Sequence, residues 1–249
     1  WWVHCFERGP VFVAGARGLI LSGDSAGFMA LPTPDPAATL YGIWGTDPDS
    51  MWAVGSDGTN GVIWRGNREG FATFDVDPEL LERVTLFKVW GRSDDDVYMV
   101  GDQGKVLHFD GERVEAMSSG TENPLITVHG TADATYAVGG LGGSVVLGLE
   151  SGSWIDLTPA DAPAVNGVYA QGDDVYVVGV FGEVLHRTKG GQFQRLETGL
   201  DLAREYHAVW VDDTGGVWAV GGHVNDAPLV QGMLSYSGHQ QLPPLTDPL

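Results

Sequence analysis

The stretch VYMVGDQGKVLHFDG, from Val97 to Gly111, holds two short apolar runs joined by the glycine-bounded segment GDQG. Short apolar runs bounded by Asp, Ser and Gly are typical of β-strands joined by tight turns. The glycine that closes the first run recurs at intervals of 38 to 46 residues, as Gly15, Gly55, Gly101, Gly139, Gly179 and Gly221. The chain is therefore a tandem repeat of strands and turns.

Each repeat contains four apolar stretches, and a repeat of about 40 residues with four strands is typical of a β-propeller blade. The sequence thus predicts an all-β fold, a six-bladed β-propeller with four antiparallel strands per blade and little or no helix. It predicts a single domain over residues 1–249, with blades at residues 1–39, 40–85, 86–124, 125–164, 165–205 and 206–249.

The order of strands predicts how the ring closes. The first repeat begins at its innermost strand and the last ends at its outermost, so we expect closure without a strand exchanged between the termini. Residues upstream of Trp1 would allow a seventh blade or a different closure. The only expected helix lies around residues 78–83.

Charge and composition exclude some classes of partner. The chain carries 33 acidic and 13 basic residues, a net charge of −20, which repels the phosphates of nucleic acids. No apolar run approaches the 18 residues that a membrane span requires. With one cysteine, Cys5, the chain forms no internal disulfide.

The fragments VWG, DVYMVGDQG and VLHFDG of the third repeat resemble the blades of bacterial β-propeller proteins with the pattern VWG, DVYAVG and G-x-ILH-DG. The resemblance covers essentially the whole chain. Members of this family are often secreted and largely uncharacterised, so the resemblance implies a propeller fold and an extracellular or periplasmic location. It implies no activity, because the motif residues build blades. The chain also resembles photosystem assembly-factor propellers more loosely, but their Asp-box turn is not found in this sequence.

A column of large rings is expected near the propeller axis. The position after the apolar Val or Ile of each innermost strand reads His4, Trp44, Trp90, His129, Tyr169 and Trp210. One interpretation is a pocket wall, with the three tryptophans binding a ligand. The other, which we favour from the sequence, is that the rings wedge adjacent blades together.

Metal ligation has two candidate places, although the sequence requires no cofactor. His4 and His207 belong to neighbouring blades with Cys5 close by, a donor set for a transition metal, whereas His129 would face His4 only across the channel. The acidic turn Asp94, Asp95 and Asp96 is a candidate surface Ca²⁺ site. The alternative is that these aspartates accept hydrogen bonds from their own turns.

Three further features are ascribed to architecture. His108 and His186 occupy the same strand position two repeats apart, too far to share a metal, and are expected to pack on outer strands. GDSAG, residues 23–27, matches the nucleophile pattern G-x-S-x-G but falls at a hairpin turn without a following helix. GDQG recurs as GARG and GVFG, so it is a turn and not a phosphate loop.

Two loops are longer than the repeat requires, at residues 55–61 and 221–232. Function on repeat scaffolds usually lies in such loops. We therefore predict a recognition surface built from His223, Asn225, Asp226, Asp57, Asn60 and Arg17. The alternative is that the last loop only caps the closure of the ring.

These features favour a non-catalytic binding or scaffold module whose partner is another protein or a glycan. One alternative is a hydrolase- or lyase-type enzyme with its site at the channel mouth, and another is a sugar-binding lectin. An enzyme would show a compact His/Glu/Asp cluster with shifted pKa values in an axial pocket. A lectin would repeat one pocket between several blades.

Overall fold

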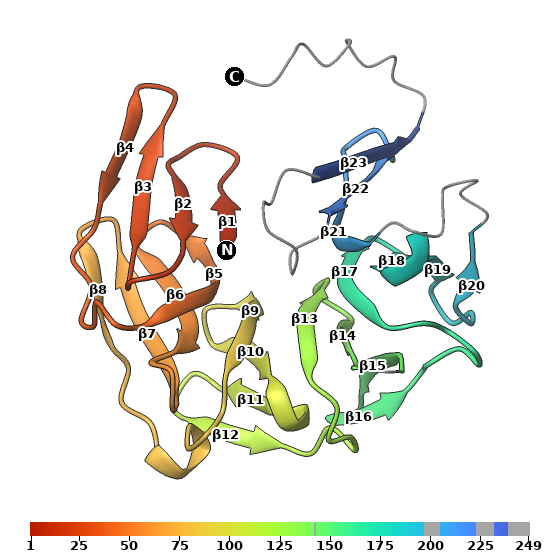
Figure 1. Cartoon of the computed structure of the whole chain (residues 1–249), viewed down its shortest axis with the longest axis horizontal. Coiled ribbons are helices and arrows are strands. Elements are labelled where there is room, and N and C mark those ends of the chain that lie inside the picture. Colours follow the sequence, from red (N-terminus) through yellow and green to blue (C-terminus); the bar gives the residue numbers. More distant parts are fainter. Residues whose placement is uncertain (142, 197–204, 223–231, 239–249) are drawn as a thin grey trace.

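The computed structural model describes residues 1–141, 143–196, 205–222 and 232–238. They form six antiparallel sheets arranged as blades around an axis, which confirms the predicted six-bladed β-propeller (Figure 1). Five sheets have four strands, and the sixth has three among the described residues. The end of the last predicted blade, residues 239–249, lies outside them. No helix within the described residues is long and apolar enough to cross a membrane.

The strands run outward from the axis in sequence order within every blade. Blade one contains β1 (Trp2–Cys5), β2 (Val11–Ala14), β3 (Ile20–Asp24) and β4 (Gly27–Ala30). Blade two contains β5 (Thr39–Asp47), β6 (Ser50–Ser56), β7 (Gly61–Asn67) and β8 (Gly70–Thr73). Blade three contains β9 (Leu86–Ser93), β10 (Asp96–Gly101), β11 (Val106–Phe109) and β12 (Val114–Met117).

The other three blades repeat this pattern. Blade four contains β13 (Leu125–Gly130), β14 (Thr135–Gly139), β15 (Val145–Glu150) and β16 (Ser153–Asp156). Blade five contains β17 (Val165–Gln171), β18 (Asp174–Gly179), β19 (Val184–Thr188) and β20 (Gln194–Arg195). Blade six contains β21 (Tyr206–Val211), β22 (Val217–Gly222) and β23 (Gly232–Ser237).

Helical structure is confined to single 3₁₀ turns among the described residues. The expected helix at 78–83 is the short turn η1 (Pro78–Leu80), where the Asp77 carboxylate accepts a hydrogen bond from the Glu79 N–H at 3.1 Å. The GDQG and GVFG segments form η2 (Asp102–Gly104) and η3 (Val180–Gly182). Both join the second and third strands of a blade, as the repeat predicts.

The recurring glycine of the repeat is required by sterics. A Cβ on Gly101 would lie 2.2 Å from the carbonyl oxygen of Thr85, at the start of the innermost strand. Gly139 and Gly179 meet the backbone in the same way, at 2.1 and 2.2 Å. Gly15 is the exception, since the nearest atom to its Cβ would be 3.9 Å away.

Apolar cores fill five of the six blade interfaces. Each of the five interfaces from blades one and two to blades five and six has its own buried cluster. Val54, Val100, Val138 and Val178 occupy equivalent positions facing the next blade, and all are 0% exposed. Their equivalent in blade six, Val220, is 43% exposed. The interface between blades six and one therefore lacks a packed core in the part of the chain that the structure describes.

The first blade shows the other side of this open interface. Val3 is 52% exposed, whereas its equivalents Ile43, Val89 and Val128, which face the preceding blade, are exposed by at most 2%. In Figure 1, β1 and β21 stand apart at the two ends of the row of blades. Among the residues that the structure describes, the outer apolar faces of blades one and six therefore do not cover each other.

Candidate functional site: the axial pocket

A pocket of about 700 Å³ occupies the propeller axis. It is lined by all six innermost strands, and it continues between Val3 and Cys5 of blade one and Val220 and Leu234 of blade six. We call this lateral extension the blade 6–1 opening. Pockets that bind small molecules and protein side chains span roughly 300–1,000 Å³, so the volume suits a ligand group.

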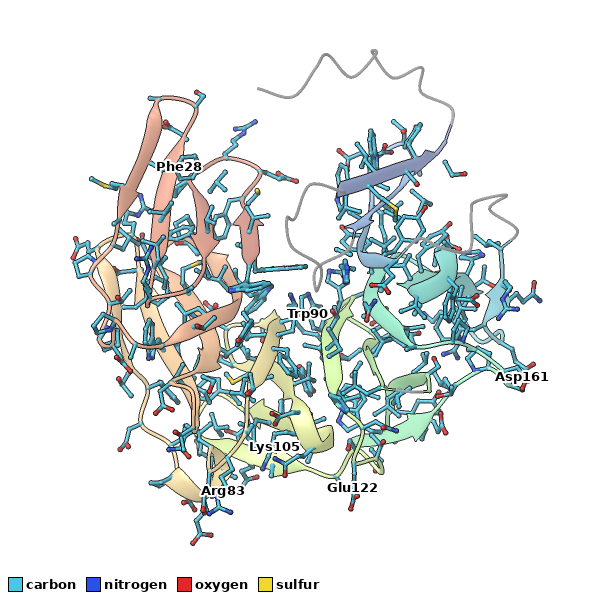
Figure 2. The ribbon with its side chains drawn as sticks, in the orientation of Figure 1. Phe28, Arg83, Trp90, Lys105, Glu122 and Asp161 are labelled. Carbon is cyan, nitrogen blue, oxygen red and sulfur yellow. The ribbon has the colours of Figure 1, made fainter. Side chains whose placement is uncertain are left out.

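The predicted column of rings lines this pocket in full. The structure brings together His4, Trp44, Trp90, His129, Tyr169 and Trp210 along its wall. Trp90 lies near the centre of the ring of blades (Figure 2). Three of the rings are in contact across blade boundaries: His129 stacks on Tyr169 at a centroid distance of 4.4 Å, and Trp90 lies tilted against His129 at 5.4 Å. The rings therefore pack blades together and also form a pocket wall.

The glycine of the VWG motif explains how the tryptophans fit. A Cβ on Gly91 would lie 2.7 Å from the Trp44 ring of the preceding blade. A Cβ on Gly130 would lie 2.8 Å from the Trp90 ring in the same way. Each indole thus occupies space that the next blade leaves free. Trp210 has no such neighbour among the described residues, and it is 50% exposed.

Lys88 is the one lysine or arginine among the described residues of the pocket lining, and no Asp or Glu of the described residues lines it. Its side chain is only 8% exposed, and its Nζ lies 3.1 Å from the centroid of the Trp2 ring. Burial holds the pKa of Lys88 well below its usual range. The recurring motifs of the repeat do not include this residue.

Lys88 differs from the residues at the equivalent position of most other repeats. The position two residues before the aromatic column reads Trp2, Gly42, Lys88, Thr127, Gly167 and Ala208. Gly42 and Gly167 let neighbouring inner strands approach, since a Cβ on either would lie 3.0 Å or less from the next blade's backbone. A long cationic side chain departs from this otherwise mostly small set.

The three histidines proposed as ligands are used in packing. Burial lowers the pKa of His129 to about 4, and its Nδ1 accepts a hydrogen bond from the Ala170 N–H at 3.0 Å. His207 Nε2 lies 2.8 Å from the Gly222 carbonyl oxygen, and burial lowers the pKa of His4. Across the described residues, no three His, Cys, Asp or Glu side chains gather as a metal-binding group.

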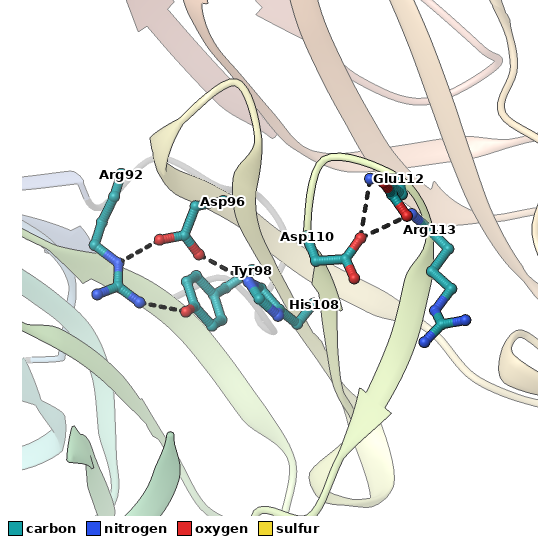
Figure 3. Close-up of polar contacts among 7 residues, drawn as sticks. All are labelled: Arg92, Asp96, Tyr98, His108, Asp110, Glu112 and Arg113. Atoms are coloured by element: carbon teal, nitrogen blue, oxygen red, sulfur yellow. Dashed lines mark hydrogen bonds and ion pairs between the residues drawn. The ribbon is translucent and has the colours of Figure 1, made fainter. Parts of the chain in front are cut away.

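The acidic turn at 94–96 does not form a convergent set of carboxylates. Asp96 lies 2.7 Å from both the Arg92 guanidinium and His108 Nε2 (Figure 3). Asp94 accepts a hydrogen bond from the Thr46 hydroxyl of blade two. These contacts direct Asp94 and Asp96 to different partners.

His108 belongs to a structural unit that recurs two blades later. Its ring stacks on Tyr98 at 4.4 Å, and the Arg92 guanidinium donates a hydrogen bond to the Tyr98 hydroxyl. His186 repeats the arrangement, with its Nε2 2.7 Å from Asp174 and its ring 4.6 Å from Tyr176. The repetition indicates a role in joining the second and third strands.

The predicted loop surface is only partly within the described residues. His223, Asn225 and Asp226 lie outside them. Asp57 accepts hydrogen bonds from the Thr59 and Asn60 N–H groups, both at 2.8 Å, and the Asn60 side chain accepts one from the Arg83 N–H at 3.1 Å. Asp57 thus holds its own loop, and Asn60 joins this loop to the connection between blades two and three. Arg17 occupies the GARG turn of blade one with a positive φ of 60°.

Comparison with known proteins supports the fold alone. No protein-family model matches the chain, and no curated protein matches it. Among solved structures, YCF48 bound to D1 peptide is similar with a TM-score of 0.68 and 12% identity, over 87% of this chain and 72% of that chain. The RRP9 WD40 repeats are similar with a TM-score of 0.67 and 13% identity, over 86% and 70% of the respective chains.

A third similar structure is that of a protein described as an enzyme. It is described as a putative oxidoreductase (glucose dehydrogenase) from Thermus thermophilus. Its TM-score is 0.63 at 14% identity, over 95% of this chain and 96% of that chain. At these identities the shared property of the three structures and this chain is the β-propeller fold.

Proposed function

We propose that this β-propeller is a non-catalytic binding module that takes an apolar segment of a protein partner into its axial pocket. The observation that carries the proposal is the lining itself, in which indole rings surround an accessible space and the described residues contribute no acidic side chain. Trp and Tyr are enriched among residues that dominate binding energy at protein interfaces. The blade 6–1 opening gives an extended segment a lateral way in.

Uncovered apolar surface supplies the driving force. Trp210 is 50% exposed, and Val220 and Leu234 beside it are similarly open to solvent. A buried aromatic side chain removes about 150–250 Å² from water. Covering the exposed half of Trp210 would therefore contribute about 2 kcal/mol to binding, at ~25 cal/mol per Å².

The fold is compatible with this use. One similar structure is YCF48 bound to D1 peptide, so the β-propeller fold is compatible with peptide binding. A glycan would need several polar side chains to pair with its hydroxyl groups. The Thr127 hydroxyl in the lining already donates to the Asn166 carbonyl oxygen at 2.7 Å, which favours an apolar ligand over a sugar.

An enzymatic site at the channel mouth is the competing hypothesis. General acid–base catalysis in such a pocket would use carboxylates or a titrating histidine. The described lining contributes no carboxylate, and His129 engages its Nδ1 in packing. The geometry therefore supports binding better than turnover.

Peptide binding tests the proposal. We would screen the protein against an array of extended nonapeptides rich in Leu, Phe and Trp, and measure affinities by isothermal titration calorimetry. Trp210→Ser should weaken binding at least tenfold, whereas Phe181→Ser, at an exposed turn outside the pocket lining, should leave it unchanged. Equal affinity in Trp210→Ser and the wild type would refute the site. Binding of oligosaccharides but of no apolar peptide would refute the ligand class.

A further inference from the structure

Lys88 is an isolated cation in an acidic protein. The chain has 33 acidic residues, yet no ion pair or hydrogen bond to a described residue involves the Lys88 ammonium group. Its side chain is more than nine-tenths buried, and it lies in the pocket lining. The one compensating contact is the face of the Trp2 ring, a cation–π interaction.

Such a group weakens the folded state. An ammonium removed from water without an anionic partner carries a desolvation penalty. Blade architecture does not require it, because Gly42, Thr127, Gly167 and Ala208 fill the same position in four other blades. A cation held at a cost to stability inside a pocket is the signature of a binding group.

The other ionisable groups near Lys88 do not neutralise it. In blade one, His4 lies in the lining, and burial together with the charge of Lys88 lowers the pKa of the Trp1 α-amino group. On β13, His129 is the ionisable group of the lining. All of these are basic, so the described residues of the pocket present only positive or neutral groups.

We propose that the axial pocket binds a carboxylate attached to an apolar, indole-sized body, with the carboxylate paired to the Lys88 ammonium group. One ammonium matches the single charge of a carboxylate, whereas a phosphate dianion would need further donors. A charge-assisted N–H···O contact of about 2.7–2.9 Å is the expected geometry. The indoles of Trp44, Trp90 and Trp210 would enclose the apolar body.

This inference deepens the proposed function, since a partner segment would offer a carboxylate at its C-terminus or on a side chain. It does not depend on peptide binding for its test. Small aromatic acids reach the pocket without a polypeptide, so they report on Lys88 separately.

The test compares indole-3-acetate with its neutral isostere, indole-3-acetamide, by calorimetry at pH 7. The wild type should bind the acid at least tenfold more tightly than the amide, and Lys88→Met should lose this preference. Lys105→Met, which lies outside the lining, is the matched control and should keep it. Lys88→Met should also unfold at a higher urea concentration than the wild type, since it removes an unpaired buried cation.

Two results would overturn the inference. One is a wild type that binds the acid no better than the amide, or neither at millimolar concentration. The other is a Lys88→Met variant that retains the preference. A second comparison uses apolar peptides with free and amidated C-termini, and with and without an internal Asp, to identify the source of the carboxylate. If peptide affinity does not depend on any carboxylate while indole-3-acetate still binds selectively, the carboxylate site is supported. Its role in binding the protein partner is then refuted.

Discussion

Replacing valine by threonine at equivalent positions distinguishes an open ring from a closed one. Val138 and Val220 each precede the recurring glycine and face the next blade, but Val138 is 0% exposed and Val220 is 43% exposed. Threonine has nearly the shape of valine and suits a strand, so the substitution leaves no cavity and mainly adds a hydroxyl group.

The expected cost follows from burial. Burying a hydroxyl group without a new partner costs roughly 1–3 kcal/mol in proteins, so Val138→Thr should destabilise the fold by about 2 kcal/mol. At Val220 the hydroxyl stays in water, and the cost should be below about 0.5 kcal/mol. Val209→Thr is the internal control, because Val209 lies in the same blade but packs in the core with blade five. It should cost about 2 kcal/mol.

Urea unfolding monitored by tryptophan fluorescence measures these differences, provided that the slope of the transition does not change. If Val220→Thr destabilises the protein as much as Val138→Thr and Val209→Thr, blades six and one pack against each other in solution. The blade 6–1 opening would then not exist, and the lateral entrance to the pocket would be lost with it.

Three other properties of the structure have measurable consequences. Gly101→Ala should cost about 3 kcal/mol or more in urea unfolding, because its Cβ would meet backbone, whereas Gly15→Ala should be tolerated. The free energy of unfolding should fall by up to about 3 kcal/mol as pH drops from 6.5 to 4. The pKa of His129 is about 4 in the folded protein and about 6.5 in the unfolded chain, so over this range the unfolded chain binds a proton that the folded protein does not. The variant His129→Gln should lose this part of the pH dependence. Phe181→Asn should raise the free energy of unfolding in urea by about 0.5 kcal/mol, because φ at this position is 57°, a conformation that asparagine tolerates better than phenylalanine.

The blade architecture was predictable because its causes are local in sequence. The recurring glycine, the turn residues and the apolar runs each act within one repeat, and the close approach of Gly101 to Thr85 spans a single blade. The same holds for GDQG, whose positive φ at Gln103 and Gly104 fits a tight turn between two strands. Six copies of these signals made the repeat visible without any knowledge of tertiary contacts.

The pocket chemistry was less accessible because it depends on residues far apart in the chain. The Lys88 ammonium lies against the ring of Trp2, and its burial follows from strands of several blades meeting at the axis. The exposure of Val3 and Val220 likewise depends on whether the two ends of the ring meet, which a repeat pattern does not encode. Only the departure of Lys88 from the small residues at its repeat position gave a clue.

The two sequence interpretations of the aromatic column prove to be compatible, and the position of each ring in the row of blades decides which one applies. Trp44 and Trp90 fit against Gly91 and Gly130 of the following blades, so these two rings pack at blade interfaces. Trp210 belongs to the last blade, and the residue that would follow it around the ring, Cys5, is itself exposed. The same side chain that closes an interface elsewhere is therefore half exposed in blade six.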